Sequence, residues 1–287
     1  MKNPLSKPTG LRVLLLGAAC TSALVVVLIF AFLVYFSAPL WSGKGVVALL
    51  TGGWRPFSGE FGIFPMVAGS FILSITAFLI SYPLALGLCS FANGAGPKWA
   101  AKSVLGLLYL MTGVPTVVYG FISAMLLVPY VRGLLGSGTG YSWMTASLTL
   151  ALLITPTIAL VIHSSIKESE KTLRPTAAAL GFTPEQRLLY LTLPSSGRGL
   201  LAAGLLGFGR AAGDTMVALM VAGNAPIIPT SPAAPLRTLT SHIGLVVATD
   251  ATSDAYQSLF AAGLLLFAFS VAVNLGARWA VQAGERG

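Results

Sequence analysis

The chain has 287 residues, of which 55% are hydrophobic and only 9% are charged, and its mean hydropathy is +0.85. Soluble domains carry about 25% charged residues, so this composition excludes an ordinary soluble fold and predicts an integral membrane protein. The net charge of +9 is spread over short segments between apolar runs, with no basic stripe and no interleaved aromatic residues. We therefore attribute the charge to membrane topology and expect no nucleic-acid partner.

Six apolar runs are long enough to cross about 30 Å of hydrocarbon as helices. The first run is too long for the apolar region of a signal peptide, and we expect it to be retained as a span. The predicted spans are Val13–Ser37, Met66–Phe91, Val104–Tyr130, Trp143–His163, Gly199–Ala222 and Ser258–Ala280. The sequence thus predicts an all-α membrane protein with six transmembrane helices.

The basic residues predict the orientation, because Lys and Arg are enriched in cytoplasmic loops. With both termini in the cytoplasm, twelve basic residues lie inside: Lys2, Lys7, Arg12, Lys98, Lys102, Lys167, Lys171, Arg174, Arg187, Arg198, Arg278 and Arg286. Four lie outside: Lys44, Arg55, Arg132 and Arg237. The remaining one, Arg210, falls within the fifth predicted span.

The chain is expected to have two parts. Residues 1–65 comprise the N-terminal cytoplasmic tail, the first span and an extracytoplasmic loop, and residues 66–287 form the transmembrane core. A charged cytoplasmic loop at 164–198 interrupts this core.

The sequence of the loop at 164–198 predicts two short helices joined by a turn. Pro175 suits the first position of one helix and Gly181 the left-handed residue after its end. Thr183 suits the N-cap of the next helix, Gln186 completes a capping box, and Pro194 is expected to end that helix. Such a segment either lies on the membrane surface or docks in a groove of a cytoplasmic partner.

The fifth predicted span contains two charges. Arg210 and Asp214 are four residues apart, which places them on one face of a continuous helix. Ionisable residues inside a membrane are costly and usually mark a transport pathway; the alternative is an ion pair that fixes packing. Gly209 and Gly213 form a Gly-x-x-x-Gly step that lets another helix approach, from a partner subunit or from the same chain.

Enzymatic functions find little support. No Gly-x-x-x-x-Gly-Lys-Ser/Thr element is present, so the chain supplies no P-loop for ATP. The two histidines, His163 and His242, are predicted on opposite sides of the membrane, which argues against a shared metal or an intramembrane hydrolase.

Two segments of the cytoplasmic loop resemble the "EAA" loop of ABC importer permeases. They are Thr176–Gly181 and Leu191–Pro194, in which Gly181, Leu193 and Pro194 match the family pattern in identity and spacing. Pro175 stands where the family has Glu, and Thr176 where it has Ala. The resemblance implies that this loop couples the chain to a separate ATP-binding subunit.

Other segments resemble the C-type permease of phosphate-specific (Pst) importers. They are 209–216 with 220–224, 62–65 with 69–70, and 113–121. Asp214 replaces the Glu that is usual in the family, which keeps the charge and shortens its reach by one methylene.

This resemblance implies the type I (MetI-like) permease fold, a place in a bacterial inner membrane and a transport role without enzymatic activity, metal or cofactor. The implied partners are a dimer of ATP-binding subunits, a second, A-type permease, an extracytoplasmic phosphate-binding protein and membrane lipid. The implied pathway residues are Arg210, Asp214, Thr215 and Asn224. The implied coupling residues are Ala177, Gly181, Arg187, Leu191, Leu193 and Pro194.

The substrate stays open at this stage. A guanidinium group pairs bidentately with tetrahedral oxyanions, which suits phosphate but equally sulfate, molybdate or phosphonate. One hypothesis is that Asp214 holds Arg210 between transport events and yields to the anion when it arrives. A membrane protein without transport activity is the remaining alternative.

Overall fold

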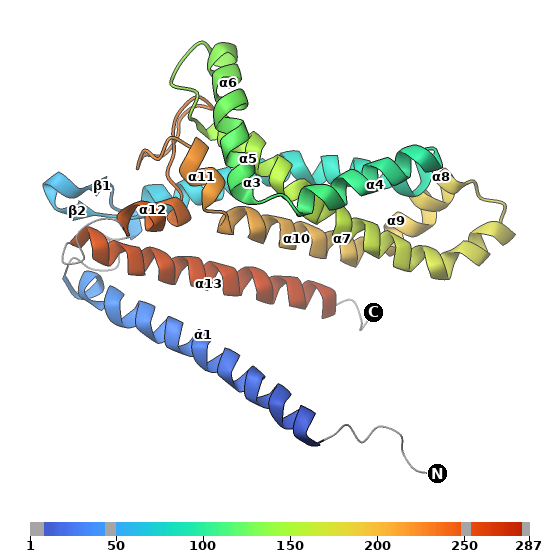
Figure 1. Cartoon of the computed structure of the whole chain (residues 1–287), viewed down its shortest axis with the longest axis horizontal. Helices are drawn as coiled ribbons and strands as arrows, with labels where there is room; N and C mark the ends of the chain where they lie inside the picture. Colours follow the sequence, from blue (N-terminus) through green and yellow to red (C-terminus); the bar gives the residue numbers. More distant parts are fainter. Residues whose placement is uncertain (1–8, 44–49, 248–253, 283–287) are drawn as a thin grey trace.

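The computed structural model describes residues 9–43, 50–247 and 254–282 and is built almost entirely of helices (Figure 1). Five of the described helical segments are long and apolar enough to cross a membrane. They are Arg12–Pro39, Phe64–Gly94, Thr116–Leu135, Trp143–Ala179 and Tyr256–Gly276. The fifth segment predicted from the sequence is present as two shorter helices, α10 (Gly197–Gly213) and α11 (Met216–Val221).

The core forms around α7 (Trp143–Ala179), which packs against α3 (Phe64–Ser90) and α10. Residues Leu150, Ile154, Ile158, Ile162 and Ile166 recur every four positions along α7 and are buried. Positions four apart share one face of a helix, so this stripe is the seam that α3 and α10 cover. Figure 1 shows α7 and α10 running along each other through the body of the molecule.

Two glycines allow α10 to approach α7 closely. A side chain at Gly207 would collide with Ile158, and one at Gly199 would collide with Ser165. Helix association in membranes depends on such close backbone packing, because lipid offers no hydrophobic drive between helices. The two glycines therefore fix the position of α10, which carries Arg210.

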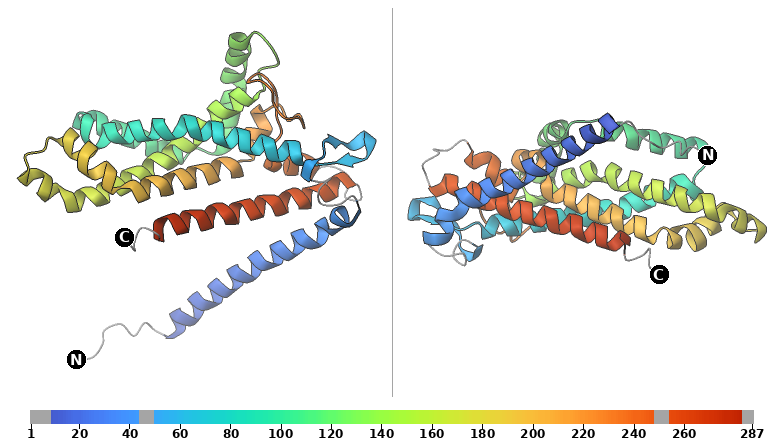
Figure 2. Two further views of the ribbon diagram at one scale, coloured as in Figure 1. Left: turned by 180° about the vertical axis from the view of Figure 1, so that it is seen from behind. Right: turned by 90° about the horizontal axis from the view of Figure 1, so that it is seen from below.

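Two peripheral helices, α1 (Thr9–Gly43) and α13 (Asp254–Gln282), lie side by side where the C-terminal end of α1 meets the N-terminal end of α13. They diverge toward the two chain termini (Figures 1 and 2). Aromatic contacts hold the junction: Phe260 packs against Phe32 and Phe36, with ring centroids 5.6 and 5.0 Å apart. The rest of α1 exposes apolar side chains, as a helix that faces lipid or another membrane helix must.

The third predicted span, Val104–Tyr130, is wrong as a single helix. α4 (Lys98–Thr112) ends before Pro115, and a new helical segment begins at Thr116 with α5 (Thr116–Ile122). A π-helical turn, η3 (Ser123–Leu127), joins α5 to α6 (Val128–Leu135), which rises away from the body of the molecule (Figure 1). Proline has no N–H to donate and disfavours helical geometry in the residue before it, so the helix divides at Pro115.

A small cap, called the outer cap here, closes the end of the molecule that the sequence predicts to be extracytoplasmic. Strands β1 (Trp54–Arg55) and β2 (Glu60–Phe61) form a two-stranded antiparallel hairpin around the short 3-10 helix η1 (Pro56–Ser58). Next to it lies α12 (Leu239–Val246), whose first backbone N–H, at Leu239, donates to Ser70 Oγ over 2.8 Å. The ring of Trp54 packs edge-on against His242, with centroids 4.6 Å apart. The hairpin, α12 and the start of α3 are thereby tied together.

Candidate functional site

The site is built around a break between α10 and α11. α10 ends at Gly213, Asp214 is extended (φ −71°, ψ 129°), and α11 begins at Met216. The expectation that Arg210 and Asp214 share one face of a continuous helix is therefore wrong. Discontinuous helices in transporters place helix ends, with their unpaired backbone groups, at the substrate site.

Asp214 serves the helix that follows it. Its Oδ2 accepts a hydrogen bond from the backbone N–H of Val217 over 2.8 Å, which satisfies one of the free N–H groups at the start of α11. The backbone carbonyl of Asp214 accepts a second hydrogen bond, from Thr240 Oγ1 of α12, over 2.8 Å. The break is thus joined directly to the outer cap.

Arg210 lies in the last turn of α10 and faces another helix. Its Nη1 donates to Thr157 Oγ1 of α7 over 2.7 Å. Within the described residues, no ion pair joins Arg210 to Asp214 or to any other carboxylate; the ion pairs present are Arg55–Glu60, Lys171–Glu168 and Arg187–Glu170. The positive charge is favoured by the C-terminal end of the α10 dipole, and no carboxylate of the described residues lies within ion-pair distance of it.

Arg210 is exposed and lines a pocket of about 490 Å³ between α1, α10 and α13. Leu33 of α1 and both Ser270 and Asn274 of α13 line the same pocket. A half-open space with one cation and a few polar groups among apolar walls is the usual form of a small-ligand site. The arrangement can therefore receive an anion without first breaking a salt bridge.

Thr215 and Asn224 lie beyond opposite ends of α11. Thr215 is half-buried at the break, whereas Asn224 follows the outer end of the helix with a left-handed φ of 54°. Asn224 Nδ2 donates to the carbonyl of Leu219 over 2.6 Å, and its own carbonyl accepts from Arg237 Nε over 2.8 Å. The structure thus brings Arg210, Asp214 and Thr215 to one place and sets Asn224 apart, as a cap of the helix end.

The two glycines of the predicted interface have different surroundings. A side chain at Gly209 would lie 3.2 Å from Val273 of α13, whereas one at Gly213 would meet nothing within 4 Å. Gly209 therefore packs within the chain, and Gly213 leaves space beside the break.

Arg237, which is charged, and His242, which is neutral, interact electrostatically in the outer cap. Burial lowers the pKa of Arg237 from its ordinary value. Burial, and then the positive charge of Arg237, lowers the pKa of His242 from 6.5 to about 3. His242 is thus neutral at physiological pH, with its Nε2 3.0 Å from Ser258 Oγ. The sequence analysis assigned neither residue to a site, because a lone basic group in a loop carries no signal.

The loop at 164–198, which is predicted to be cytoplasmic, departs from the prediction in its first half. Pro175 does not begin a new helix but lies inside α7, which continues unbroken to Ala179. Gly181 does adopt the predicted left-handed conformation (φ 71°). The N–H groups of Gly181 and Phe182 then donate to the carbonyls of Ala178 and Ala177, which is the Schellman end of a helix.

The second half of the loop follows the prediction more closely. α8 (Pro184–Arg187) begins with the capping box formed by Thr183 and Gln186. The helix then continues through a π-helical turn, η4 (Leu188–Thr192), and α9 (Leu193–Ser195). The expected stop at Pro194 is therefore displaced by one residue, because proline is tolerated in the first turn of a helix.

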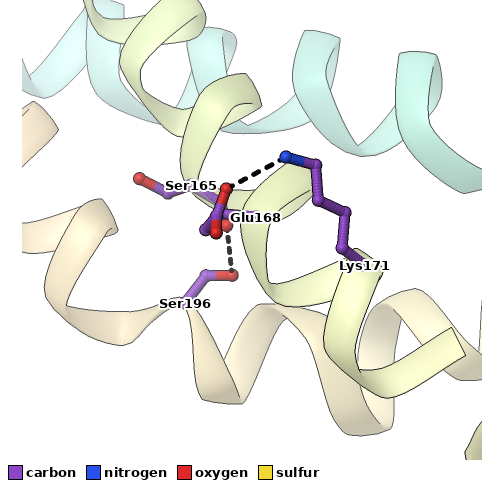
Figure 3. Close-up of polar contacts among 4 residues, drawn as sticks. All are labelled: Ser165, Glu168, Lys171 and Ser196. Carbon is purple, nitrogen blue, oxygen red and sulfur yellow. Dashed lines mark hydrogen bonds and ion pairs between the residues drawn. The ribbon is translucent and has the colours of Figure 1, made fainter. Parts of the chain in front are cut away.

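The loop is braced against the C-terminal part of α7. Arg187 Nη2 lies 2.7 Å from Glu170 Oε1 in an ion pair whose side chains are largely shielded. Ser196, which is buried, donates to Thr192 and lies within hydrogen-bonding distance of Ser169 Oγ (2.9 Å) and the Ser165 carbonyl (3.3 Å). Figure 3 shows the Ser196–Ser165 contact beside the exposed pair of Lys171 and Glu168.

The predicted coupling residues are not equally accessible. Ala177 is buried, Leu191 and Leu193 are half-buried, and Pro194 is exposed. Three apolar side chains that were not singled out are strongly exposed on the same loop: Leu180, Leu189 and Tyr190. Exposed aromatic and aliphatic groups at a loop tip are typical of a protein interface.

These features define a helical protein with several membrane-crossing helices, a broken helix at its site and a braced loop at 164–198. Residues 85–283 match the family described as "Binding-protein-dependent transport system inner membrane component". The chain belongs to this family and is therefore a permease subunit of an ABC importer, a multi-pass protein of the inner membrane that works with an ATPase and a binding protein.

Curated relatives support this assignment. The chain is 33% identical over 235 residues, covering 80% of this chain and 76% of the relative, to the probable ABC transporter permease protein YqgH of Bacillus subtilis. It is 28% identical over 282 residues to the phosphate transport system permease protein PstC 1 of Mycobacterium tuberculosis, covering 88% of this chain and 82% of the relative. It is also 28% identical to PstC of Pasteurella multocida, covering 91% and 84%.

Solved structures agree on the fold. A chain from an inward-facing structure of the MetNI methionine ABC transporter matches with a TM-score of 0.56 and 18% identity, covering 77% of this chain and 94% of that one. A chain from the crystal structure of an amino acid ABC transporter with histidines matches with a TM-score of 0.55 and 14% identity, covering 76% and 92%. The type I (MetI-like) permease fold expected from the sequence is thus confirmed.

Proposed function

We propose that this permease carries inorganic phosphate and that Arg210 is the group that meets the anion within the membrane. The observation that carries the proposal is the state of Arg210: it sits beside a helix break, lines a pocket and has no carboxylate partner among the described residues. An intramembrane cation without a counter-ion is costly, and an anionic substrate would supply the missing charge. The phosphate transport permeases among the curated relatives favour phosphate as that anion.

In this proposal Asp214 and Thr215 shape the break, and Gly213 leaves space for the anion beside it. In this proposal Asp214 does not hold Arg210 at rest, since Asp214 Oδ2 accepts the N–H of Val217 and Arg210 donates to Thr157. Asn224 supports the outer end of α11 through its bond to Leu219. Gly209 lets α10 pack closely against α13, and Gly213 leaves free space beside the break.

We further propose that the partners are those of a phosphate-specific importer: a dimeric PstB-like ATPase, a PstA-like second permease and an extracytoplasmic PstS-like phosphate-binding protein. The cytoplasmic loop 164–198 would dock on the ATPase with Leu180, Leu189 and Tyr190. The hairpin and α12 would face the binding protein. In this proposal both termini lie in the cytoplasm, as the distribution of Lys and Arg predicts.

Uptake of radiolabelled phosphate tests the substrate. A host that lacks only this chain and keeps the partner subunits is complemented with the wild-type chain, and uptake is measured with and without excess sulfate or molybdate. The proposal predicts that uptake is restored and that neither competing anion reduces it. Uptake of sulfate or molybdate in its place would identify a permease for another oxyanion, the second candidate, since a guanidinium binds these anions equally well.

A further inference from the structure

The side chain that accepts a hydrogen bond from Arg210 belongs to α7 and is neutral. Thr157 follows Pro156 in the middle of that helix, and its Oγ1 accepts a hydrogen bond from Arg210 Nη1 over 2.7 Å. This contact crosses the seam between α7 and α10, which are 53 residues apart in the chain at this point. Nothing in the sequence motifs or the relatives assigns a role to Thr157.

Thr157 differs from two other threonines of α7, Thr149 and Thr155. A threonine inside a helix usually turns its hydroxyl back to the carbonyl four residues earlier. Thr149 does so to Thr145, and Thr155 does so to Ala151, over 2.8 and 2.7 Å. Among the hydrogen bonds of the described residues, Thr157 makes no such bond, and its oxygen is occupied by the guanidinium of Arg210.

A neutral acceptor has a specific consequence for a charged donor. It fixes the direction of the guanidinium through one N–H and leaves the remaining N–H groups and the whole positive charge available. A carboxylate in the same place would neutralise the charge, and an incoming anion would have to displace it. Asp214 does not take this place: its Oδ2 accepts the Val217 N–H, and among the described residues no ion pair joins it to Arg210.

We propose that Thr157 is a positioning residue: it holds Arg210 in one orientation between transport cycles, so that the free N–H groups of the guanidinium face a tetrahedral oxyanion. This inference rests on the proposed function of Arg210. It names the group that prepares Arg210 and explains how a lone intramembrane cation keeps its direction without a counter-ion.

The test replaces only the hydroxyl. Thr157→Val keeps the shape of the side chain and removes the oxygen, whereas Thr157→Ser keeps the oxygen. The assembled transporter, with its partner subunits and phosphate-loaded binding protein, is reconstituted in vesicles, and phosphate uptake and ATP hydrolysis are measured together. Thr149→Val is the matched control, because it removes a hydroxyl from the same helix that bonds only within that helix.

We expect Thr157→Val to lower the rate of phosphate uptake about tenfold, as the loss of a hydrogen bond to a charged group predicts. ATP hydrolysis stimulated by the binding protein should stay within about twofold of wild type, so that less phosphate is carried per ATP. Thr157→Ser should restore uptake, and Thr149→Val should leave the ratio of phosphate to ATP unchanged. If valine prevents assembly, Thr157→Ala removes the same oxygen with a smaller side chain and carries the same expectation.

Two results would overturn the inference. One is wild-type uptake by Thr157→Val; the other is an equal fall in uptake and ATP hydrolysis, which indicates structural damage only. Failure of the proposed function looks different, because the wild-type chain would then not carry phosphate, or Arg210→Ala would carry it normally.

Discussion

The carboxylate of Asp214 accepts a hydrogen bond from the backbone N–H of Val217 over 2.8 Å, at the start of α11. A side-chain oxygen at a helix start contributes about 1 kcal/mol to stability. Asp214→Asn retains an oxygen that can accept this bond, whereas Asp214→Ala does not. We therefore expect the alanine variant of the assembled transporter to unfold at a lower temperature than wild type and the asparagine variant to stay close to wild type. Equal melting temperatures for the two variants would show that the bond does not stabilise α11.

The ion pair between Arg187 and Glu170 is expected to hold α8 against α7 in the loop at 164–198. The two side chains are largely shielded, so Arg187→Glu would bring two carboxylates together and displace α8 from α7. We expect this variant to lose most of the ATPase subunit in co-purification, and the exchange Arg187→Glu with Glu170→Arg to recover it.

The exposed pair of Lys171 and Glu168 offers the control for this experiment. Its side chains are 69% and 79% exposed, and ion pairs in such surroundings contribute little. Lys171→Glu should therefore leave the ATPase bound. Equal losses for Lys171→Glu and Arg187→Glu would point to the net charge of the loop rather than to the bracing of α8.

The buried ring of His242 predicts a pH dependence of the outer cap. The pKa of His242 is lowered from 6.5 to about 3 by burial and by Arg237, so the unfolded state binds the proton more readily than the folded state. Stability is then fully present above pH 6.5 and decreases as the pH falls toward 3. We expect the melting temperature of the transporter to fall between pH 7 and pH 5, and to fall less in His242→Gln, which has no titrating ring. Parallel pH curves for the two proteins would contradict this assignment.

The helical membrane fold could be predicted from the sequence because apolar length alone decides which segments span a bilayer. Five of the six predicted spans correspond to long apolar helices, although the third begins at Thr116 rather than at Val104. The capping box of Thr183 and Gln186 and the left-handed Gly181 were also predictable, since each depends on residues a few positions apart.

The division of the fifth span could not be predicted in the same way. No proline marks the break at Asp214; the helix ends there because the Asp214 carboxylate accepts the Val217 N–H and its carbonyl accepts a hydrogen bond from Thr240 of α12. The second contact joins residues 26 positions apart and leaves no local pattern. Pro175 shows the opposite error, since a residue with the local signature of a helix start lies inside α7, where tertiary packing prevails.

The charged residues of the candidate site were predicted from the sequence, whereas the residues that form hydrogen bonds with them were not. Arg210 and Asp214 attract attention because charges inside an apolar run are rare. Thr157 does not, since a threonine in a span is ordinary and its contact with Arg210 depends on how α7 and α10 pack.

The role of Arg210 is tested most directly by phosphate uptake in the assembled transporter with wild type and Arg210→Ala. Insertion in the membrane and binding of the ATPase are verified for both. We predict that Arg210→Ala inserts and assembles normally but transports phosphate at less than about one hundredth of the wild-type rate, as the loss of a charged ligand contact implies. Normal phosphate uptake by this variant would contradict the account, because the intramembrane cation would then have no part in carrying the anion.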